Sequence, residues 1–411
     1  MFHAGRFSPR GEEGAVVSLP ALDNAKLLAE ETGGHGGYQF ARPIDVKLTL
    51  EDGRWTTRAD GTKAWTLTVR SRTATSLSAV FDNFHLPAGG EFYVYTHDTV
   101  RGAFTSANNK AHGWFSTAPL RGNALTFAYI QPADVEELPE ISIAKIAHGY
   151  KEAFGDAGRC NINVVCPEGR EWRDQIRGVA MMLTEFGSRY CSGSMINNAL
   201  NDGRQLFLTA KHCTGGDMYA DQLMFNYESE ICDVAEQEDG NTESTVSGLQ
   251  MLASYSSSDF ALFEVEETIP DSWNVFLNGF SAENVAPYNM VGIHHPSGDI
   301  KKICWTNETG VADWYSEAPN KFHWEVPHWD DGTTEPGSSG SPLFDQNYRI
   351  VGQLHGGAAS CTNTGGYDSY GAVWASWDQG TEKLQEFLDP ESSGVRIVEG
   401  IDLATARRAR N

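Results

Sequence analysis

Cysteine is absent from the first 159 residues of this 411-residue chain, and all seven cysteines lie from Cys160 onward. The absence excludes a disulfide framework from the first part, whereas the cluster predicts one in the second. Disulfides persist in oxidising compartments, so we expect a secreted, extracellular protein. The first fourteen residues have no apolar segment after a basic start, so no signal peptide is evident there. We expect a truncated or misassigned start, or export by another route.

Positive charge is also scarce, with 31 Lys and Arg against 55 Asp and Glu and a formal net charge of −24. Such a surface repels phosphate backbones and anionic lipid, which argues against nucleic acid and membrane surfaces as partners. No apolar run approaches the roughly 20 residues that span a bilayer. At 40% hydrophobic residues the chain suits a globular protein of two or three packed units.

The first part of the chain, residues 1–135, reads as an all-β domain. Short runs rich in β-branched and aromatic residues are separated by Gly, Asn, Asp and Pro turns, and no helical periodicity competes with them. These runs predict a sandwich-like fold. The runs are Val46–Leu50, Trp65–Val69, Glu91–Tyr95 and Leu125–Ile130.

The rest of the chain divides into three parts. Residues 136–159 have the mixed, acidic composition of a linker that proteases can reach. Residues 160–399 return to short apolar strands, except that Thr381–Pro390 predicts an amphipathic helix with a Thr cap and a terminating Pro. Residues 400–411 form a tail that we expect to fray over its basic last eight positions.

Three segments each place one reactive side chain at the end of a predicted strand: His212 in Leu206–Cys213, Asp259 in Ser258–Val265, and Ser339 in Glu335–Pro342. A serine hydroxyl is too weakly nucleophilic at neutral pH to attack a peptide. A histidine must take its proton, and a carboxylate must hold that imidazole in the right tautomer. The order His, Asp, Ser along the chain is that of chymotrypsin-type triads.

The glycines around Ser339 predict a further element of this chemistry. They let the backbone turn so that the N–H groups of Gly337 and Ser339 point at the developing oxyanion. Each such donor lowers the barrier by about 3–4 kcal/mol. Each motif alone has an ordinary explanation as a core histidine, a turn aspartate or a flexible turn, but the three in this order favour a serine hydrolase.

With these residues in view, the segment from Cys160 to about Glu399 resembles the bacterial lysyl endopeptidases, a branch of the chymotrypsin-like serine proteases. The N-terminal region is similar to their pro-region, through Tyr93–Tyr95 and Gly102–Asn109. The motifs that carry the main resemblance are Cys160–Gly169, Cys191–Asn198, Leu208–Cys213, His294–Pro296, Glu335–Pro342, Gly352–Gly357 and Leu388–Pro390.

The resemblance implies two six-stranded β-barrels with the triad between them, acting without a cofactor or metal. Spacing alone leaves 15 pairings of six cysteines open. The resemblance implies Cys160–Cys361, Cys166–Cys232 and Cys191–Cys213, the last pinning the loop that bears His212. Cys304 is left over, and because it lies in a predicted strand we expect a buried free thiol.

The resemblance also implies the substrate-binding residues. Asp368 matches the carboxylate at the base of the primary pocket that selects lysine, although alone it would read as a turn aspartate beside two glycines. A buried carboxylate facing an apolar shaft favours a long cationic side chain, because an unpaired buried charge is costly. His355, followed by Gly356, is expected to line the substrate cleft. Trp314 is expected to stack near the catalytic histidine, with a core role as its alternative.

One departure bears on activation. Before the nucleophile stands Ser338, where trypsin-like enzymes carry an aspartate that pairs with the newly freed N-terminus. A hydroxyl cannot form that ion pair, so activation by N-terminal insertion is not expected. We expect the N-terminal domain to assist folding as an intramolecular chaperone, to cover the cleft as an inhibitor, and then to be removed. Lys151 is the favoured self-processing site and Arg159 the weaker candidate.

The sequence therefore predicts a secreted, monomeric serine endopeptidase, made as a zymogen, that cleaves proteins and peptides after lysine. A same-fold protease with arginine or glutamate preference stays open, and Asp368 argues against glutamate. A catalytically inactive binding module is a third possibility. A metal hydrolase is disfavoured, because His294 and His295 are adjacent and point in different directions.

Overall fold

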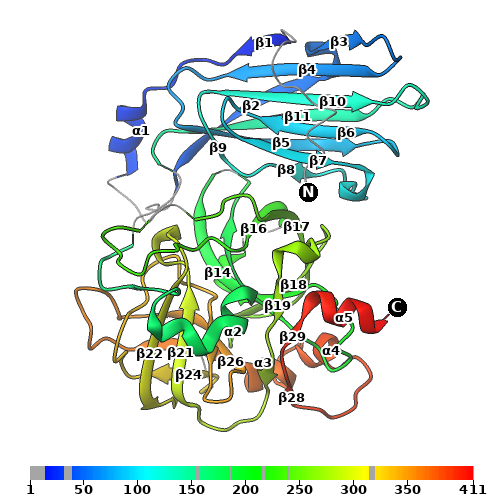
Figure 1. Ribbon diagram of the computed structural model, residues 1–411. Coiled ribbons are helices and arrows are strands. Elements are labelled where there is room, and N and C mark those ends of the chain that lie inside the picture. Colours follow the sequence, from blue (N-terminus) through cyan, green and yellow to red (C-terminus); the bar gives the residue numbers. More distant parts are fainter. Residues whose placement is uncertain are drawn as a thin grey trace. The chain divides into compact units, whose positions relative to one another are not determined.

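The computed structural model describes residues 14–31, 39–152, 157–185, 187–214, 218–237, 240–313 and 320–410. The chain forms two units, Met1–Ala153 and Phe154–Asn411. In Figure 1 the first is coloured blue to cyan and the second green to red. Within the described ranges, no helix combines the length and apolar character that crossing a membrane requires.

The first unit is built of two β-sheets. One has the order β1-β4-β10-β6-β7 with β3 paired to β4, and the other has the order β2-β11-β5-β8 with β9 paired to β5. Its elements are β1 (Ala15–Ser18), α1 (Asn24–Glu31), β2 (Ala41–Thr49), β3 (Arg54–Thr57), β4 (Lys63–Arg70), β5 (Ser76–His85), β6 (Glu91–Tyr95), β7 (Val100–Phe104), β8 (Phe115–Ser116), β9 (Leu120–Arg121), β10 (Ala124–Gln131) and β11 (Glu140–Gly149).

The core of this unit lies between the sheets. Alternate residues of β4 and β10, such as Trp65 and Phe127, meet alternate residues of β5 and β11, such as Phe81 and Ile143, and all four are fully buried. Phe81 contacts Phe127 edge to face at 5.9 Å. The predicted strands overlap β2, β4, β6 and β10, whereas α1 was not predicted.

The second unit contains a closed six-stranded barrel, β13-β14-β15-β18-β17-β16, and a ten-stranded sheet. The barrel strands are β13 (Val179–Leu183), β14 (Arg189–Ile196), β15 (Leu206–Ala210), β16 (Met218–Met224), β17 (Thr245–Tyr255) and β18 (Phe260–Val265). The sheet strands are β12 (Ile162–Asn163), β20 (Phe280–Ser281), β21 (Tyr288–His294), β22 (Lys302–Thr309), β23 (Val311–Asp313), β24 (His323–Val326), β25 (Pro342–Phe344), β26 (Ile350–Gly357), β27 (Asp368–Ala372) and β28 (Ile397–Val398).

The predicted mostly-β, chymotrypsin-like fold is confirmed. The first barrel has the expected six strands. The second set has ten, because the short strands β12, β20, β23 and β28 extend the other six. The remaining elements of the unit are α2 (Arg173–Gly178), α3 (Val373–Asp378), α4 (Gln385–Leu388) and α5 (Leu403–Arg410), with β19 (Phe276–Leu277) paired to β29 (Ile401–Asp402).

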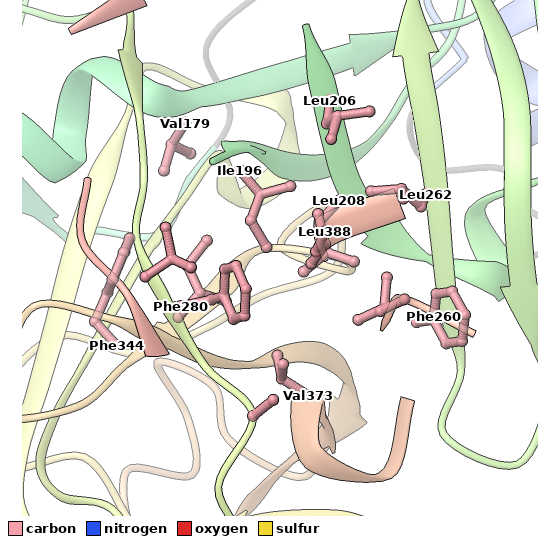
Figure 2. Close-up of a cluster of buried hydrophobic side chains, with 14 of the residues drawn as sticks. Val179, Ile196, Leu206, Leu208, Phe260, Leu262, Phe280, Phe344, Val373 and Leu388 are labelled. Atoms are coloured by element: carbon pink, nitrogen blue, oxygen red, sulfur yellow. The ribbon is translucent and has the colours of Figure 1, made fainter. Parts of the chain in front are cut away.

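A shared core joins the barrel to the sheet. Figure 2 shows Leu208 and Leu262 of the barrel in one cluster with Phe280 and Phe344 of the sheet. Burying a large apolar side chain of this kind stabilises the fold by about 1.5–3 kcal/mol. The cluster therefore fixes the strand ends that carry the site.

Two predictions about the end of the chain were wrong. The helix expected over Thr381–Pro390 is confined to α4, because Leu384 N–H bonds the Ser376 carbonyl instead of extending the helix backwards. As far as Arg410 the tail is helical: α5 buries Leu403 and Ala406, and Arg407 donates hydrogen bonds to the Ile269 carbonyl and the Asp271 carboxylate.

Candidate active site

His212 lies in a short 3₁₀ turn, Lys211–Cys213, directly after the fully buried strand β15. Its side chain is 38% exposed. A disulfide joins Cys213 to Cys191 on β14, so the turn is tied covalently to a neighbouring barrel strand. The histidine is therefore presented to solvent from a rigid frame.

Asp259, the residue directly before β18, contacts His212. Its Oδ2 lies 2.7 Å from His212 Nδ1, and its Oδ1 accepts the His212 backbone N–H at 2.9 Å. Asp259 is 3% exposed and has a φ of +53°, a left-handed conformation that Asp tolerates better than most residues. The two bonds hold the imidazole with Nδ1 toward the carboxylate and Nε2 outward.

Backbone hydrogen bonds on both sides of Ser339 connect it to segments that also contact or adjoin His212. Its carbonyl accepts the N–H of Ser192, the neighbour of Cys191 in the disulfide to Cys213. The next N–H, that of Gly340, bonds the carbonyl of Leu354, which precedes His355. Gly340 has a φ of +79°, and a Cβ there would lie 2.1 Å from Thr209 Oγ1. In the part of the chain that the structure describes, no hydrogen bond joins the Ser339 hydroxyl to the His212 ring.

Two backbone N–H groups, those of Gly337 and Ser339, have no acceptor among the described residues. In a trans peptide the N–H and C=O point in opposite directions. The Pro336 carbonyl accepts Ser297 N–H at 2.7 Å, and the Ser338 carbonyl accepts Ser341 N–H at 3.0 Å. The N–H groups of Gly337 and Ser339 therefore point the other way, and neither bonds a described residue. A pair of free, oriented N–H groups can stabilise an oxyanion.

His355, on β26, stacks on His212 with ring centroids 5.4 Å apart and an interplanar angle of 17°. Its Nε2 lies 3.5 Å from Asp259 Oδ2 and its Nδ1 lies 3.0 Å from Nε2 of His323. Burial lowers the pKa of both His355 and His323 to about 4, so both rings are neutral at pH 7. Sequence reasoning missed His323, which reaches this place because β24 pairs with β27 and β27 with β26.

Asp368 begins β27 and is 1% exposed. Its Oδ2 accepts hydrogen bonds from Trp329 Nε1 and Thr334 Oγ1, both at 2.7 Å. Burial raises the pKa of the carboxyl to about 6, and these two donors oppose that shift. Among the described residues no Lys, Arg or His pairs with it. A buried carboxylate of this kind can accept a cation from outside the chain.

The other predicted positions are placed as follows. The structure pairs Cys160 with Cys361 and Cys166 with Cys232, the same pairs that the resemblance implied. Cys304 is free and buried, and burial raises the pKa of its thiol well above the usual value. Gly356 lies on β26 opposite Ser369. Trp314 lies outside the described residues.

Two groups of described side chains are close enough to hold a metal ion. One contains Cys191 and Cys213, whose sulfurs are already joined to each other. The other is His212, Asp259 and His355, the arrangement described above. His294 and His295 are in neither group, so the metal-hydrolase alternative gains no support from them.

Comparison with known proteins adds the following. A family model described as the C-terminal domain of lysyl endopeptidase matches residues 154–371, more than half of the chain. A lysyl endopeptidase of Pseudomonas aeruginosa is 29% identical over 267 residues, which cover 59% of this chain and 56% of that protein. The chain thus spans about half the length of this curated relative.

Two solved structures also match part of the chain. The thermostable serine protease AL20 from an extremophilic microorganism is 14% identical, with a TM-score of 0.34, over 47% of this chain and 89% of that one. The protease Anisep from Arthrobacter nicotinovorans is 16% identical, with a TM-score of 0.34, over 48% of this chain and 90% of that one.

Proposed function

Because the chain belongs to the lysyl endopeptidase family, we propose that its second unit is a serine endopeptidase that cleaves on the carboxyl side of lysine. The observation that carries the proposal is the His212–Asp259 pair, together with the N–H groups of Gly337 and Ser339, which no described residue accepts. These groups supply a base, an orienting carboxylate and oxyanion donors. The 29% identity to the Pseudomonas aeruginosa lysyl endopeptidase supports lysyl peptides as the substrate class.

The proposed reaction proceeds through an acyl-enzyme. The Ser339 oxygen attacks the scissile carbonyl carbon while His212 Nε2 takes the hydroxyl proton. The carbonyl oxygen becomes an oxyanion that accepts the N–H groups of Gly337 and Ser339. The C–N bond then breaks as His212 gives its proton to the leaving amine. Water repeats the sequence, releasing the carboxylate product and restoring Ser339.

Lysine preference is proposed to come from Asp368. A lysine ammonium brought to this buried carboxylate would lower the carboxyl pKa from its raised value and supply the missing countercharge. A glutamate side chain would place a second carboxylate beside it, which like-charge repulsion disfavours. Arginine also carries a cation, so it is the main competing specificity. The inactive binding module is disfavoured, because none of the reacting groups is missing.

Cleavage-site mapping tests this proposal. Digestion of a denatured protein mixture should give peptides that end in lysine, with the cut sites identified by mass spectrometry. Asp368→Asn should lower kcat/KM for lysyl peptides by about 10²–10³-fold, because the cation would then be buried without its partner. Cutting mainly after arginine would support the alternative specificity. An unchanged lysine preference in the variant would show that Asp368 does not bind the substrate lysine.

We further propose that the cysteine-free first unit is a pro-domain of a secreted zymogen. The three disulfides of the second unit suit an oxidising compartment. Lys151 lies at the end of the first unit, half-buried, with its carbonyl bonded by Thr75 Oγ1 at 2.8 Å. Cleavage there therefore requires a local opening. Arg159 is exposed but lies next to the disulfide-bonded Cys160.

N-terminal sequencing of the active protein checks the processing step. We expect the mature chain to begin at Glu152, and Lys151→Ala to accumulate the full-length chain with little activity. Arg159→Ala should process normally and serves as the matched control. A full-length Lys151→Ala chain with wild-type activity would show that removal of the first unit is unnecessary.

A further inference from the structure

We call the segment Glu335–Gly340 the oxyanion loop. A second segment, His294–Asp299, is hydrogen-bonded to it, and we call this the latch loop. Ser338 is the central contact between them. It is fully buried, and its Oγ accepts the Glu335 N–H at 3.1 Å and lies 2.7 Å from His294 Nδ1. The donor in the contact with His294 is set by the tautomer of the ring, since a hydroxyl can accept two bonds or donate one.

His294 contributes no charge to this contact. Its ring is fully buried, and burial, with the charge of Lys302 nearby, lowers its pKa to about 3. The imidazole is therefore neutral at pH 7, and its Nδ1 donates or accepts in the bond to Ser338 according to the tautomer. The contact joins two neutral groups.

Two further bonds set the peptide planes of the oxyanion loop. Ser297 N–H of the latch loop donates to the Pro336 carbonyl at 2.7 Å. The hydroxyl of Ser192 donates to the Gly337 carbonyl at 3.0 Å and accepts His295 N–H at 2.9 Å. A Cβ at Gly337, whose φ is +96°, would lie 3.0 Å from Ser297 N, so the loops are in close contact. The first of these bonds turns the Gly337 N–H away from the latch loop.

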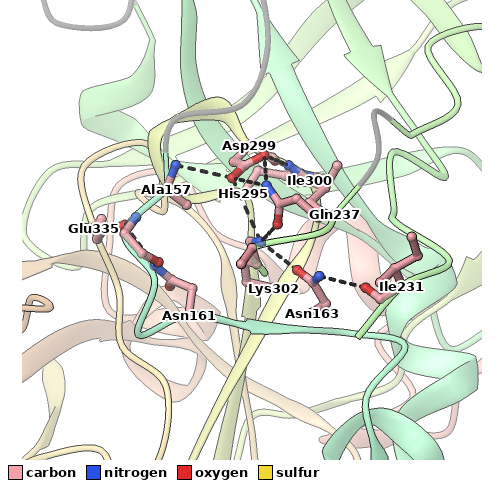
Figure 3. A network of polar contacts seen from close by, with 12 residues as sticks. Ala157, Asn161, Asn163, Ile231, Gln237, His295, Asp299, Ile300, Lys302 and Glu335 are labelled. Atoms are coloured by element: carbon pink, nitrogen blue, oxygen red, sulfur yellow. Dashed lines mark hydrogen bonds and ion pairs between the residues drawn. The ribbon is translucent and has the colours of Figure 1, made fainter. Parts of the chain in front are cut away.

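The latch loop is itself anchored in a polar network, shown in Figure 3. The Asp299 carboxylate accepts bonds from Ile300 N–H at 2.7 Å and from Gln237 Nε2 at 2.9 Å. Lys302, fully buried, donates to Asn163 Oδ1 at 2.5 Å and to Gln237 Oε1 at 2.6 Å, and its Nζ lies 3.8 Å from Asp299 Oδ2. A buried network with this many bonds is rigid.

The chain on either side of Cys160 is bonded to both loops through N–H groups. Ala157 N–H bonds Asp299 Oδ2 at 3.2 Å, and Gly158 N–H bonds Glu335 Oε2 at 2.9 Å. Asn161 Nδ2 also donates to Glu335 Oε2, at 2.8 Å (Figure 3). These donors are internal peptide and amide N–H groups, which exist whether or not the chain has been cut upstream.

We propose that the latch loop holds the oxyanion loop in its working conformation through neutral hydrogen bonds, with Ser338 as the positioning residue. The inference rests on the proposed function, because it assigns the geometry of that same oxyanion site. It deepens that function by removing any need for a charged chain terminus to shape the site.

The test compares Ser338→Ala with Ser338→Thr in the processed enzyme. Loss of the hydroxyl frees the peptide on the N-terminal side of Ser339, so kcat on a lysyl peptide should fall about 10²-fold while KM changes by less than about threefold. Affinity for a lysyl peptide aldehyde, which forms a tetrahedral adduct, should fall in parallel with kcat. Ser338→Thr keeps the hydroxyl and should restore most of the rate.

Ser194→Ala is the matched control. Ser194 is equally buried and its hydroxyl bonds the Met195 carbonyl and the Asn278 amide, outside both loops. It should lose thermal stability without losing kcat. Should Ser338→Ala not fold, Ser192→Ala tests the same idea through the Gly337 carbonyl, with a kcat loss of about tenfold expected.

Three results would overturn the inference. The first is a wild-type kcat in Ser338→Ala, or in Ser192→Ala when that variant replaces it. The second is an equal loss of kcat in Ser338→Ala and Ser194→Ala, and the third is a Ser338→Thr enzyme as slow as Ser338→Ala. Failure of the proposed function looks different. In that case the wild-type enzyme itself would cleave no peptide and react with no serine-directed phosphonylating reagent, and both proposals would fall together.

Discussion

Ser339→Ala is expected to lower kcat on lysyl peptides by about 10⁶-fold, with KM little changed. The backbone bonds to Ser192 and Leu354 hold position 339 and its neighbour in place, and alanine there leaves no hydroxyl to attack the substrate. The residual rate would come from the oxyanion donors and substrate binding alone. Steady-state kinetics on purified, processed protein measure the effect.

Labelling with a serine-directed phosphonylating reagent provides the control for this prediction. One reagent molecule should attach to each wild-type chain and none to Ser339→Ala, as read from the intact mass. Ser194→Ala should label like the wild type. Labelling of Ser339→Ala, or retention of its peptidase activity, would mean that a different residue is the nucleophile.

The sequence predicted the strand-end positions of the reactive residues because local patterns determine them. Strand β15 ends at Ala210, two residues before His212, and β18 begins at Phe260, one residue after Asp259. The alternation of apolar residues and turns is a short-range signal. The pairing of these two strands, Ala210 opposite Phe260, then brings the two side chains together.

The residues that sequence reasoning missed are those placed by long-range strand pairing. Trp329 and Thr334 precede Asp368 by 39 and 34 positions, yet both donate to its carboxylate. No spacing rule predicts such a contact, because loops of any length can intervene. His323 was missed for the same reason.

Ser338 shows the same contrast between what a local pattern predicts and what the fold alone determines. Its identity predicted that the usual ion pair is absent, since a hydroxyl carries no charge. What replaces the ion pair could not be predicted, because His294 is 44 positions away and joins Ser338 only through the fold. The wrong prediction for the tail has a related cause. The basic composition of the tail predicted a solvated end, but Arg407 bonds Asp271, which is distant in the sequence.

Asp259→Asn is expected to lower kcat by about 10⁴-fold at neutral pH. The Asp259 Oδ1 accepts the His212 backbone N–H, so an asparagine would keep its carbonyl oxygen there and turn its NH₂ toward His212 Nδ1. The ring would then have to accept at Nδ1 and carry its proton on Nε2. In that tautomer Nε2 cannot take the Ser339 proton. Steady-state kcat, with circular dichroism to verify folding, measures the loss.

Asp221→Asn separates this tautomer effect from the loss of any buried carboxylate. Asp221 lies on β16, accepts Tyr190 Oη and Glu185 N–H, and has a pKa that burial raises to about 6. Its replacement should leave kcat within about threefold of the wild type. An equal loss in both variants would assign the Asp259 effect to folding. A loss confined to Asp259→Asn, with unchanged substrate KM, would show that the carboxylate acts through the ring of His212.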